Sequence, residues 1–200
     1  MRDLIQRWRT PILLLATVLM AAAIYLPLWG MTLVSTQYPE GLHMVVYTGR
    51  IAGDLNEINA LNRYIGMTPI TDEFFVELRL LPIAFGVVAA LILGAAIIRR
   101  RWVPAIPLIA MATVAGWGLW SMRNRLYQFG HDLDPTAPIT IDPFTPPMIG
   151  LNQIAQFASY TYFSWGTFLP LIAGVLVALV FWAGLGARRP ALARPVLAAA

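Results

Sequence analysis

Four long apolar blocks dominate this chain of 200 residues. Each block is close to the roughly 20 residues that a helix needs to cross the hydrocarbon core of a bilayer. Only 12% of the residues are charged, about half the share of a typical soluble domain. We therefore predict an all-α membrane protein with one four-helix domain over residues 1–200. Its four transmembrane helices are expected at about 12–34, 72–98, 102–121 and 167–185.

Two long loops, at about 35–71 and 122–166, connect these predicted helices on one side of the membrane. Binding residues are concentrated on loops that a rigid scaffold positions, so a local function is expected there. The chain has no cysteine, which excludes disulfides, thiolate metal sites and cysteine nucleophiles. No ionisable side chain falls in the central part of a predicted span, which argues against an ion pump and against haem ligation inside the bundle.

The arginines are unevenly divided between the two sides of the predicted bundle. One side has a single acid, Asp3, and nine arginines: Arg2, Arg7, Arg9, Arg99, Arg100, Arg101, Arg188, Arg189 and Arg194. The other side has five arginines and nine acids. The positive-inside rule therefore predicts cytoplasmic N and C termini and two extracytoplasmic loops. Nucleic-acid binding by the arginine clusters is the less favoured reading, and no nucleic-acid partner is expected.

The first loop contains the signals of a turn and a short amphipathic helix. Tyr38, Pro39, Glu40 and Gly41 form a turn signal, and residues 43–47 alternate as a strand or extended segment does. Apolar residues then recur at helical spacing over 54–67, with Asp54 as the expected N-cap, Glu57 completing a capping box and Gly66 as the C-cap. We expect this helix to lie on the membrane surface or on top of the bundle.

The second loop combines a proline-rich strap with an aromatic segment. Five prolines between 135 and 147 exclude a continuous helix there. The aromatic residues of 157–165 are most simply read as an interfacial belt at the entrance of the fourth span.

Imidazole and thioether side chains in the two loops are the candidates for metal binding. His43, Met67 and His131 are ligand types that suit copper, although no two of them form a compact ligand motif. The alternative is structural: His131, Asp132 and Asp134 would form a hydrogen-bonded, salt-bridged turn with Arg123, Arg125 or Arg63, and Met67 would belong to the core. No catalytic triad or phosphate-binding glycine loop is evident.

Four strings in the loops resemble a known family. QYPEGL, EINALNRYIGM, GHDLDPTAPI and PPMIG, in this order between four spans, resemble small, largely uncharacterised bacterial membrane proteins encoded beside copper-chaperone and nitrous oxide reductase maturation genes. The family pattern has histidine at the position of Arg63 and asparagine at that of Asp132, which weakens the case for a shared copper site. As structural or interaction residues of this pattern we select Tyr38, Pro39, Glu40, Gly41, Glu57, Asn59, Asn62, Tyr64, Gly66, Gly130, Asp132, Asp134, Pro135, Pro147 and Gly150.

The resemblance implies a non-enzymatic accessory protein of the bacterial inner membrane that acts in denitrification. It would assist assembly or copper supply of a periplasmic copper enzyme, with transient copper as the only expected cofactor and a copper chaperone or apo-enzyme as partner. The alternatives are a structural subunit that binds an integral membrane partner and has no ligand of its own, and, ranked last, a small-solute transporter.

Overall fold

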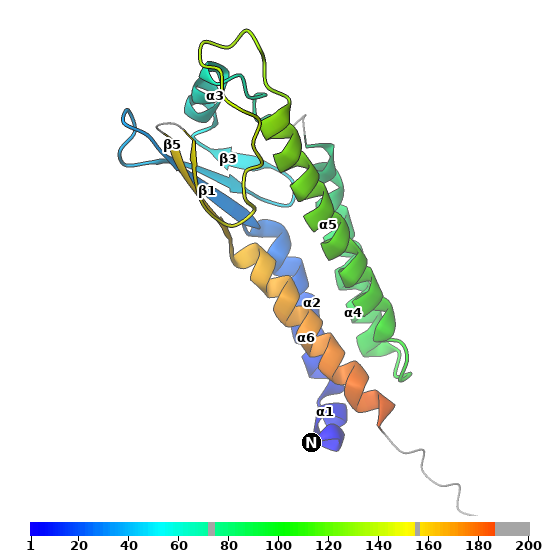
Figure 1. The fold of residues 1–200 in the computed structure, drawn as a ribbon. Coiled ribbons are helices and arrows are strands. Elements are labelled where there is room, and N and C mark those ends of the chain that lie inside the picture. The colour runs from blue at the N-terminus through cyan, green and yellow to red at the C-terminus, as the bar shows by residue number, and fades with distance from the viewer. Residues whose placement is uncertain (72–74, 155–156, 187–200) are drawn as a thin grey trace, which may run out of the picture.

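The computed structural model describes residues 1–71, 75–154 and 157–186, and it shows that the chain is not all-α. A stalk of helices carries a five-stranded antiparallel sheet at one end (Figure 1). The prediction of an all-α protein with four transmembrane helices is therefore wrong. The segments called loops in that prediction form a folded cap.

The stalk consists of helices that lie side by side along the length of the molecule (Figure 1). Its elements are α1 (Arg2–Arg7), α2 (Arg9–Ala22) with the short 3-10 helix η1 (Ala23–Tyr25), α4 (Val76–Ile97), α5 (Ala105–His131) and α6 (Trp165–Leu185). Three segments are long and apolar enough to cross a membrane: Glu77–Ile97, Ala105–His131 and Trp165–Leu185. The apolar helix Arg9–Tyr25 is shorter. The first residues of the predicted second span, 72–74, lie outside the described residues.

The first predicted span ends early because the helix cannot continue through Pro27. Leu26, the residue before this proline, adopts an extended conformation with φ −103° and ψ 149°. Proline disfavours helical geometry in the residue that precedes it. The remaining apolar residues of the block form strand β1 (Trp29–Val34).

The sheet is built from both ends of the chain. Strand β1 pairs with β2 (Leu42–Val46) on one side and with β5 (Phe157–Phe163) on the other. The edge strand β3 (Ile51–Gly53) pairs with β2, and the edge strand β4 (Gly150–Ile154) pairs with β5. The strand order is β3-β2-β1-β5-β4. Most of the expected aromatic belt at 157–165 is thus strand β5, in which β-branched and aromatic residues are favoured.

The helix expected in the first loop is present as α3 (Leu55–Tyr64). Its buried face carries Ile58 and Leu61, which pack into the core of the cap. The expected capping box is absent from its N-terminus, because the Asp54 side chain makes no cap hydrogen bond. Instead Asp54 Oδ2 accepts a hydrogen bond from the His43 N–H at 2.8 Å.

Helix α5 is longer than the predicted third span and connects stalk and cap. It continues from the predicted end at Ser121 to His131, and its Phe129 is buried in the core of the cap. The stalk has a separate core that includes Leu13, Val88 and Ile92. Leu81 packs against both cores, which therefore meet at this level of α4.

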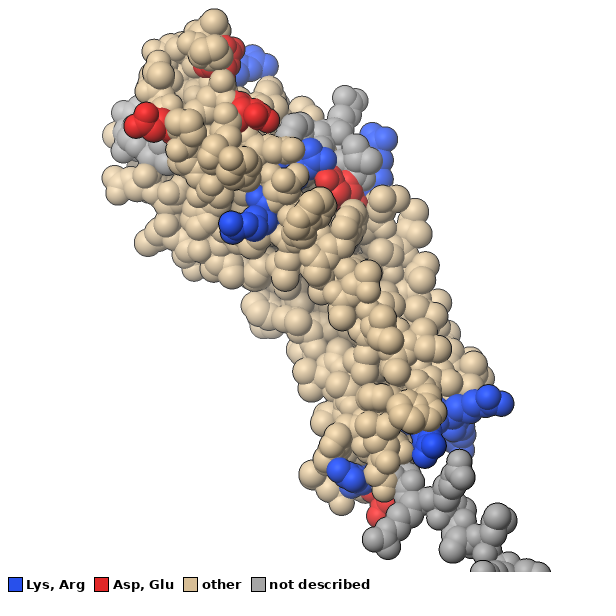
Figure 2. All heavy atoms as spheres, turned by 45° about the vertical axis from the view of Figure 1, so that its right-hand side comes forward, with Lys and Arg blue, Asp and Glu red and all other residues tan. Residues whose placement is uncertain are grey.

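The two ends of the molecule differ in charge. Basic side chains gather at the far tip of the stalk, acidic and basic side chains mix on the cap, and the surface between them is uncharged (Figure 2). The N-terminus, the α4–α5 turn and the end of α6 all lie at the tip (Figure 1). There the guanidinium of Arg9 donates to the carbonyls of Ala95, Ile98 and Arg100, each at 3.1 Å, and so caps the end of α4. Arg188, Arg189 and Arg194 lie outside the described residues.

Candidate functional site

A row of mostly exposed side chains crosses the outer face of the sheet. Leu151, Tyr160, Thr32 and His43 are successive cross-strand partners on β4, β5, β1 and β2. Leu151 is 79% exposed and Tyr160 is 49% exposed. The Tyr160 ring stacks on that of Tyr162 with centroids 5.8 Å apart. This outer sheet face is therefore an aromatic and apolar surface with one imidazole at its end.

Helix α3 ends in a Schellman motif that fixes the start of the next segment. The N–H of Met67 donates to the Asn62 carbonyl at 2.9 Å, and that of Gly66 donates to the Arg63 carbonyl at 3.4 Å. Gly66 has a positive φ of 76°, which glycine adopts without strain. The expected cap role of Gly66 agrees with this geometry. Beyond the motif, the Asn59 side chain holds Ile70 through hydrogen bonds of 2.9 and 2.7 Å.

The proline-rich strap is attached to α3 and α5 by backbone hydrogen bonds. The N–H of Asp134 donates to the Gly66 carbonyl at 2.8 Å, and that of Ile139 donates to the Tyr64 carbonyl at 3.0 Å. At the end of α5, the Phe144 N–H donates to the Gly130 carbonyl at 3.0 Å. A Cβ atom at Gly130 would overlap the Phe144 carbonyl. The residues selected in these two strings therefore bring the two loops together.

Asp134 forms a local turn at the start of the strap, directly before Pro135. Its Oδ1 accepts hydrogen bonds from the Thr136 hydroxyl at 2.6 Å and from the Thr136 N–H at 2.8 Å. These two donors hold the pKa of the Asp134 carboxyl below its ordinary value. Asp132 and Glu57 are exposed on the surface of the cap.

The other two motif strings form turns at the sheet margins. In the β1–β2 hairpin, Tyr38 exchanges backbone hydrogen bonds with Ser35, and Gly41 has φ 87°. Pro39 and Glu40 occupy the tip between them. At the other margin the Thr161 hydroxyl lies 3.2 Å from both the Pro147 and Gly150 carbonyls.

The three candidate copper ligands occupy different environments. His43 is exposed on the outer sheet face, where its Nδ1 lies 3.1 Å from the Thr32 hydroxyl. Met67 packs against the core on the opposite face of the sheet, which includes the buried Met44. His131 ends α5 and stacks on Tyr127 with ring centroids 3.8 Å apart. Met67 and His131 belong to segments joined by the Gly66–Asp134 hydrogen bond, whereas the sheet separates His43 from Met67. Within the described residues, no group of three or more His, Asp or Glu side chains could hold a metal ion.

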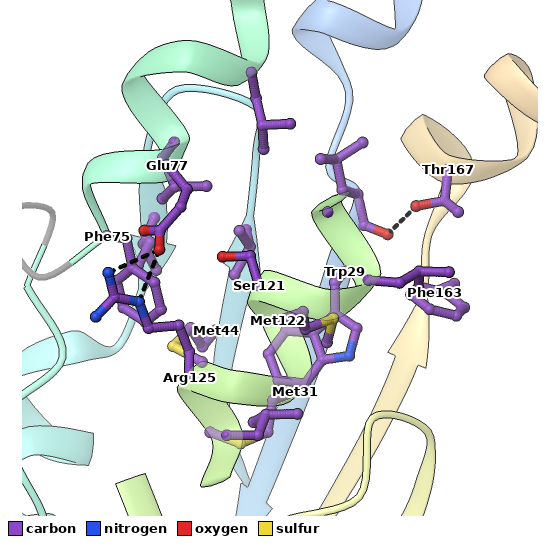
Figure 3. Close-up of a pocket in the computed structure, with 18 of the residues that line it drawn as sticks. Trp29, Met31, Met44, Phe75, Glu77, Ser121, Met122, Arg125, Phe163 and Thr167 are labelled. Carbon is purple, nitrogen blue, oxygen red and sulfur yellow. Dashed lines mark hydrogen bonds and ion pairs between the residues drawn. The ribbon is translucent and has the colours of Figure 1, made fainter. Parts of the chain in front are cut away.

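A large cavity lies where the cap meets the stalk. Its volume is about 790 Å³, and its walls come from the inner face of the sheet and from α3, α4, α5 and α6 (Figure 3). Trp29, Met31 and Met122 contribute aromatic and thioether surface. Cavities of this size and composition commonly hold small molecules.

One ion pair stands at the cavity wall. Arg125 donates to Glu77 Oε1 from Nη2 at 2.7 Å and from Nε at 3.0 Å (Figure 3). Sequence reasoning missed this pair as a site feature. The sequence does contain a signal for this pair, since Glu77 and Arg125 are separated from the Arg99–Arg101 turn by similar numbers of residues. Two antiparallel helices joined by that turn place such residues at the same height.

No protein-family model matches the chain, and no curated protein matches it either.

Proposed function

We propose that the chain is a non-enzymatic accessory protein of the bacterial cytoplasmic membrane, and that its cap offers the outer sheet face to a periplasmic partner. The exposed row from Leu151 through Tyr160 to His43 carries this proposal. Aromatic residues on a rigid surface are typical anchors of protein interfaces. The partner class, a copper chaperone or an apo-enzyme such as nitrous oxide reductase, follows from the resemblance of the loop strings.

The proposed orientation places the stalk tip in the cytoplasm and the cap in the periplasm. Support comes from the arginines at the tip, among them Arg9 and Arg99–Arg101, because positively charged segments are retained on the cytoplasmic side. The absence of native cysteine makes this testable by labelling. A membrane-impermeant maleimide should label Thr140→Cys in intact cells and Arg100→Cys only after lysis; the reverse pattern would refute the orientation.

Copper supply is a second candidate, favoured by the backbone hydrogen bond that joins the Met67 and His131 segments. A thioether and an imidazole from these segments would bind Cu(I) transiently. His43 lies beyond the sheet and would act separately, as part of the partner face.

The deciding experiment loads the detergent-purified chain with Cu(I) and measures bound metal. The Met67→Ala/His131→Ala double variant should lose near-stoichiometric copper, while His43→Ala should keep it. Partner capture should instead fail in Leu151→Ser/Tyr160→Ala, with thermal melting used to confirm folding of each variant. Copper absent from the parent would refute copper supply. Stoichiometric capture of an integral membrane protein, unaffected by the sheet variants, would favour the structural-subunit alternative.

A further inference from the structure

The cavity between cap and stalk opens sideways between α5 and α6. Several of its lining residues on these helices are also exposed on the outside, among them Leu119 at 49%, Leu171 at 59% and Val175 at 60%. The two helices approach closely at Gly174, where a Cβ atom would lie 3.3 Å from Met111 Cε. Both helices are long and apolar enough to cross a membrane. The open side of the cavity therefore faces the hydrocarbon layer and not water.

Two buried polar atoms on the cavity wall have no hydrogen-bond partner in the described part of the chain. They are Asn152 Nδ2, a donor, and Glu77 Oε2, an acceptor, which meets no donor in hydrogen-bond geometry although the Glu77 N–H and the Ser121 hydroxyl lie near the same carboxylate. A buried polar group without a partner loses its hydration and gains nothing in return, so such groups are rare and require an explanation. Both atoms lie in the wall of the same cavity, which points to a ligand that supplies the missing partners.

The charges of the cavity restrict the chemistry of that ligand. Glu77 and Arg125 are the only charged side chains among the described residues that line it, and they neutralise each other at 2.7 Å. A net charge on the ligand would stay uncompensated in this apolar site. A head group that accepts from Asn152 and donates to Glu77 needs an acceptor oxygen and a donor such as a hydroxyl.

We propose that this cavity binds a membrane-dissolved amphiphile with an uncharged glycerol-type head. Its acyl chain enters between α5 and α6 and lies against Met31, Met122 and Phe163. Its hydroxyl and ester groups reach the polar atoms of Glu77 and Asn152. This site shares only Met67 with the copper proposal, because neither His43 nor His131 lines the cavity.

The experiment uses native mass spectrometry of the delipidated full chain in detergent, with 1-monooleoylglycerol as probe. The expected result is a single bound molecule per chain. Gly118 and Gly116 provide a matched pair, because a Cβ atom at either meets nothing within 4 Å but only Gly118 lines the cavity. Gly118→Leu should lower the bound fraction at least tenfold, while Gly116→Leu should leave it unchanged.

A second pair of variants tests the hydrogen bond to the head group without filling the cavity. Asn152→Ala should weaken binding roughly fivefold to tenfold, as expected for one hydrogen bond. Gln153→Ala, on the neighbouring exposed position of β4, should have no effect. Dioleoylglycerol distinguishes a two-chain source from the one-chain probe, and binding of either supports the site.

Three outcomes would overturn the proposal. Equal binding to the parent and to a folded Gly118→Leu variant would place the lipid outside the cavity. Decylubiquinone, which has acceptors only, or oleate, which is anionic, binding as tightly as monooleoylglycerol would refute the neutral donor and acceptor head. Multiple adducts without a limiting stoichiometry would indicate lipid around the stalk only.

Discussion

The stalk and the cap bury different kinds of side chain. The stalk core contains many small residues, such as Ala16, Ala89 and Ala173, which allow helices to approach closely. The cap core contains large ones, such as Trp29, Ile58 and Phe129. Lipid tails are as apolar as leucine, so helices in a bilayer associate by close packing and polar contacts. In water, burial of large apolar side chains drives folding. The composition of the stalk core is therefore typical of helices that pack in a bilayer, and that of the cap core is typical of a domain that folds in water.

The two regions also use polar groups differently. In the stalk, Arg9 satisfies three carbonyls at the end of one helix. In the cap, backbone hydrogen bonds tie separate segments together, as between Gly66 and Asp134. Distant segments are therefore joined by a side chain in the stalk, from α2 to the end of α4, and by backbone groups in the cap.

The largest expected effect comes from a methyl group at a cap glycine. Gly130→Ala places a Cβ atom against the Phe144 carbonyl, a backbone group that cannot rotate away. We expect a loss of about 3 kcal/mol in cap stability, since overpacking of this kind costs on the order of 1–3 kcal/mol and backbone gives least. Limited proteolysis of the strap and hydrogen exchange at Phe144 measure it.

The control for this variant is Gly86→Ala in the stalk. Its Cβ meets nothing within 4 Å, and alanine is the better helix former, so stability should stay equal or rise. If both variants behave alike, the contrast between a tightly joined cap and a tolerant stalk is incorrect.

The next largest effect concerns the capped end of the stalk. Arg9→Met keeps the apolar volume but removes the donor to three carbonyls, so we expect a loss of about 2–3 kcal/mol in the free energy of unfolding. Thermal melting in detergent measures the loss, with Arg7→Met, an exposed position on α1, as control. An unchanged melting temperature for Arg9→Met would mean that water satisfies these carbonyls equally well.

The smallest effect is a pH dependence of the strap. The folded pKa of Asp134 is lowered, so its contribution to stability is present above the unfolded value, about 3.9, and is lost as the pH falls through the folded pKa. Proteolysis of the strap with an acid protease should therefore increase at the acid end of a pH series. Asp134→Asn and Thr136→Val should each flatten this profile; a parent profile equal to theirs would exclude the Asp134 turn as its cause.

Local periodicity predicted the stalk and α3 but not the sheet. The helices at 76–97 and 165–185 nearly coincide with predicted spans, because a helix satisfies its own backbone and leaves an unbroken apolar run. Trp29–Val34 was assigned to the first span because a short apolar run is equally typical of a buried strand and of a helix. Its main partner, β5, is more than a hundred residues away, and nothing local indicates that pairing.

The sequence predicted the helix cap at Gly66 but not the cavity. Gly66 showed its cap role through its position after an apolar helical pattern. The cavity was not predictable, because it arises from the distance between α5, α6 and the sheet. Asn152 is an example, because only the position of β4 at the cavity shows that its Nδ2 is buried without a partner.

The position of β1 at the centre of the sheet has a consequence for biosynthesis. The β1–β2–β3 segment leaves the ribosome well before β5, which pairs with β1 from Trp29 to Val34. At 5–20 residues per second, synthesis of the intervening chain takes about ten seconds. During that interval one edge of β1 has no strand beside it, and such edges are prone to wrong pairing. The first hairpin is therefore exposed to wrong pairing until the last hairpin has been synthesised.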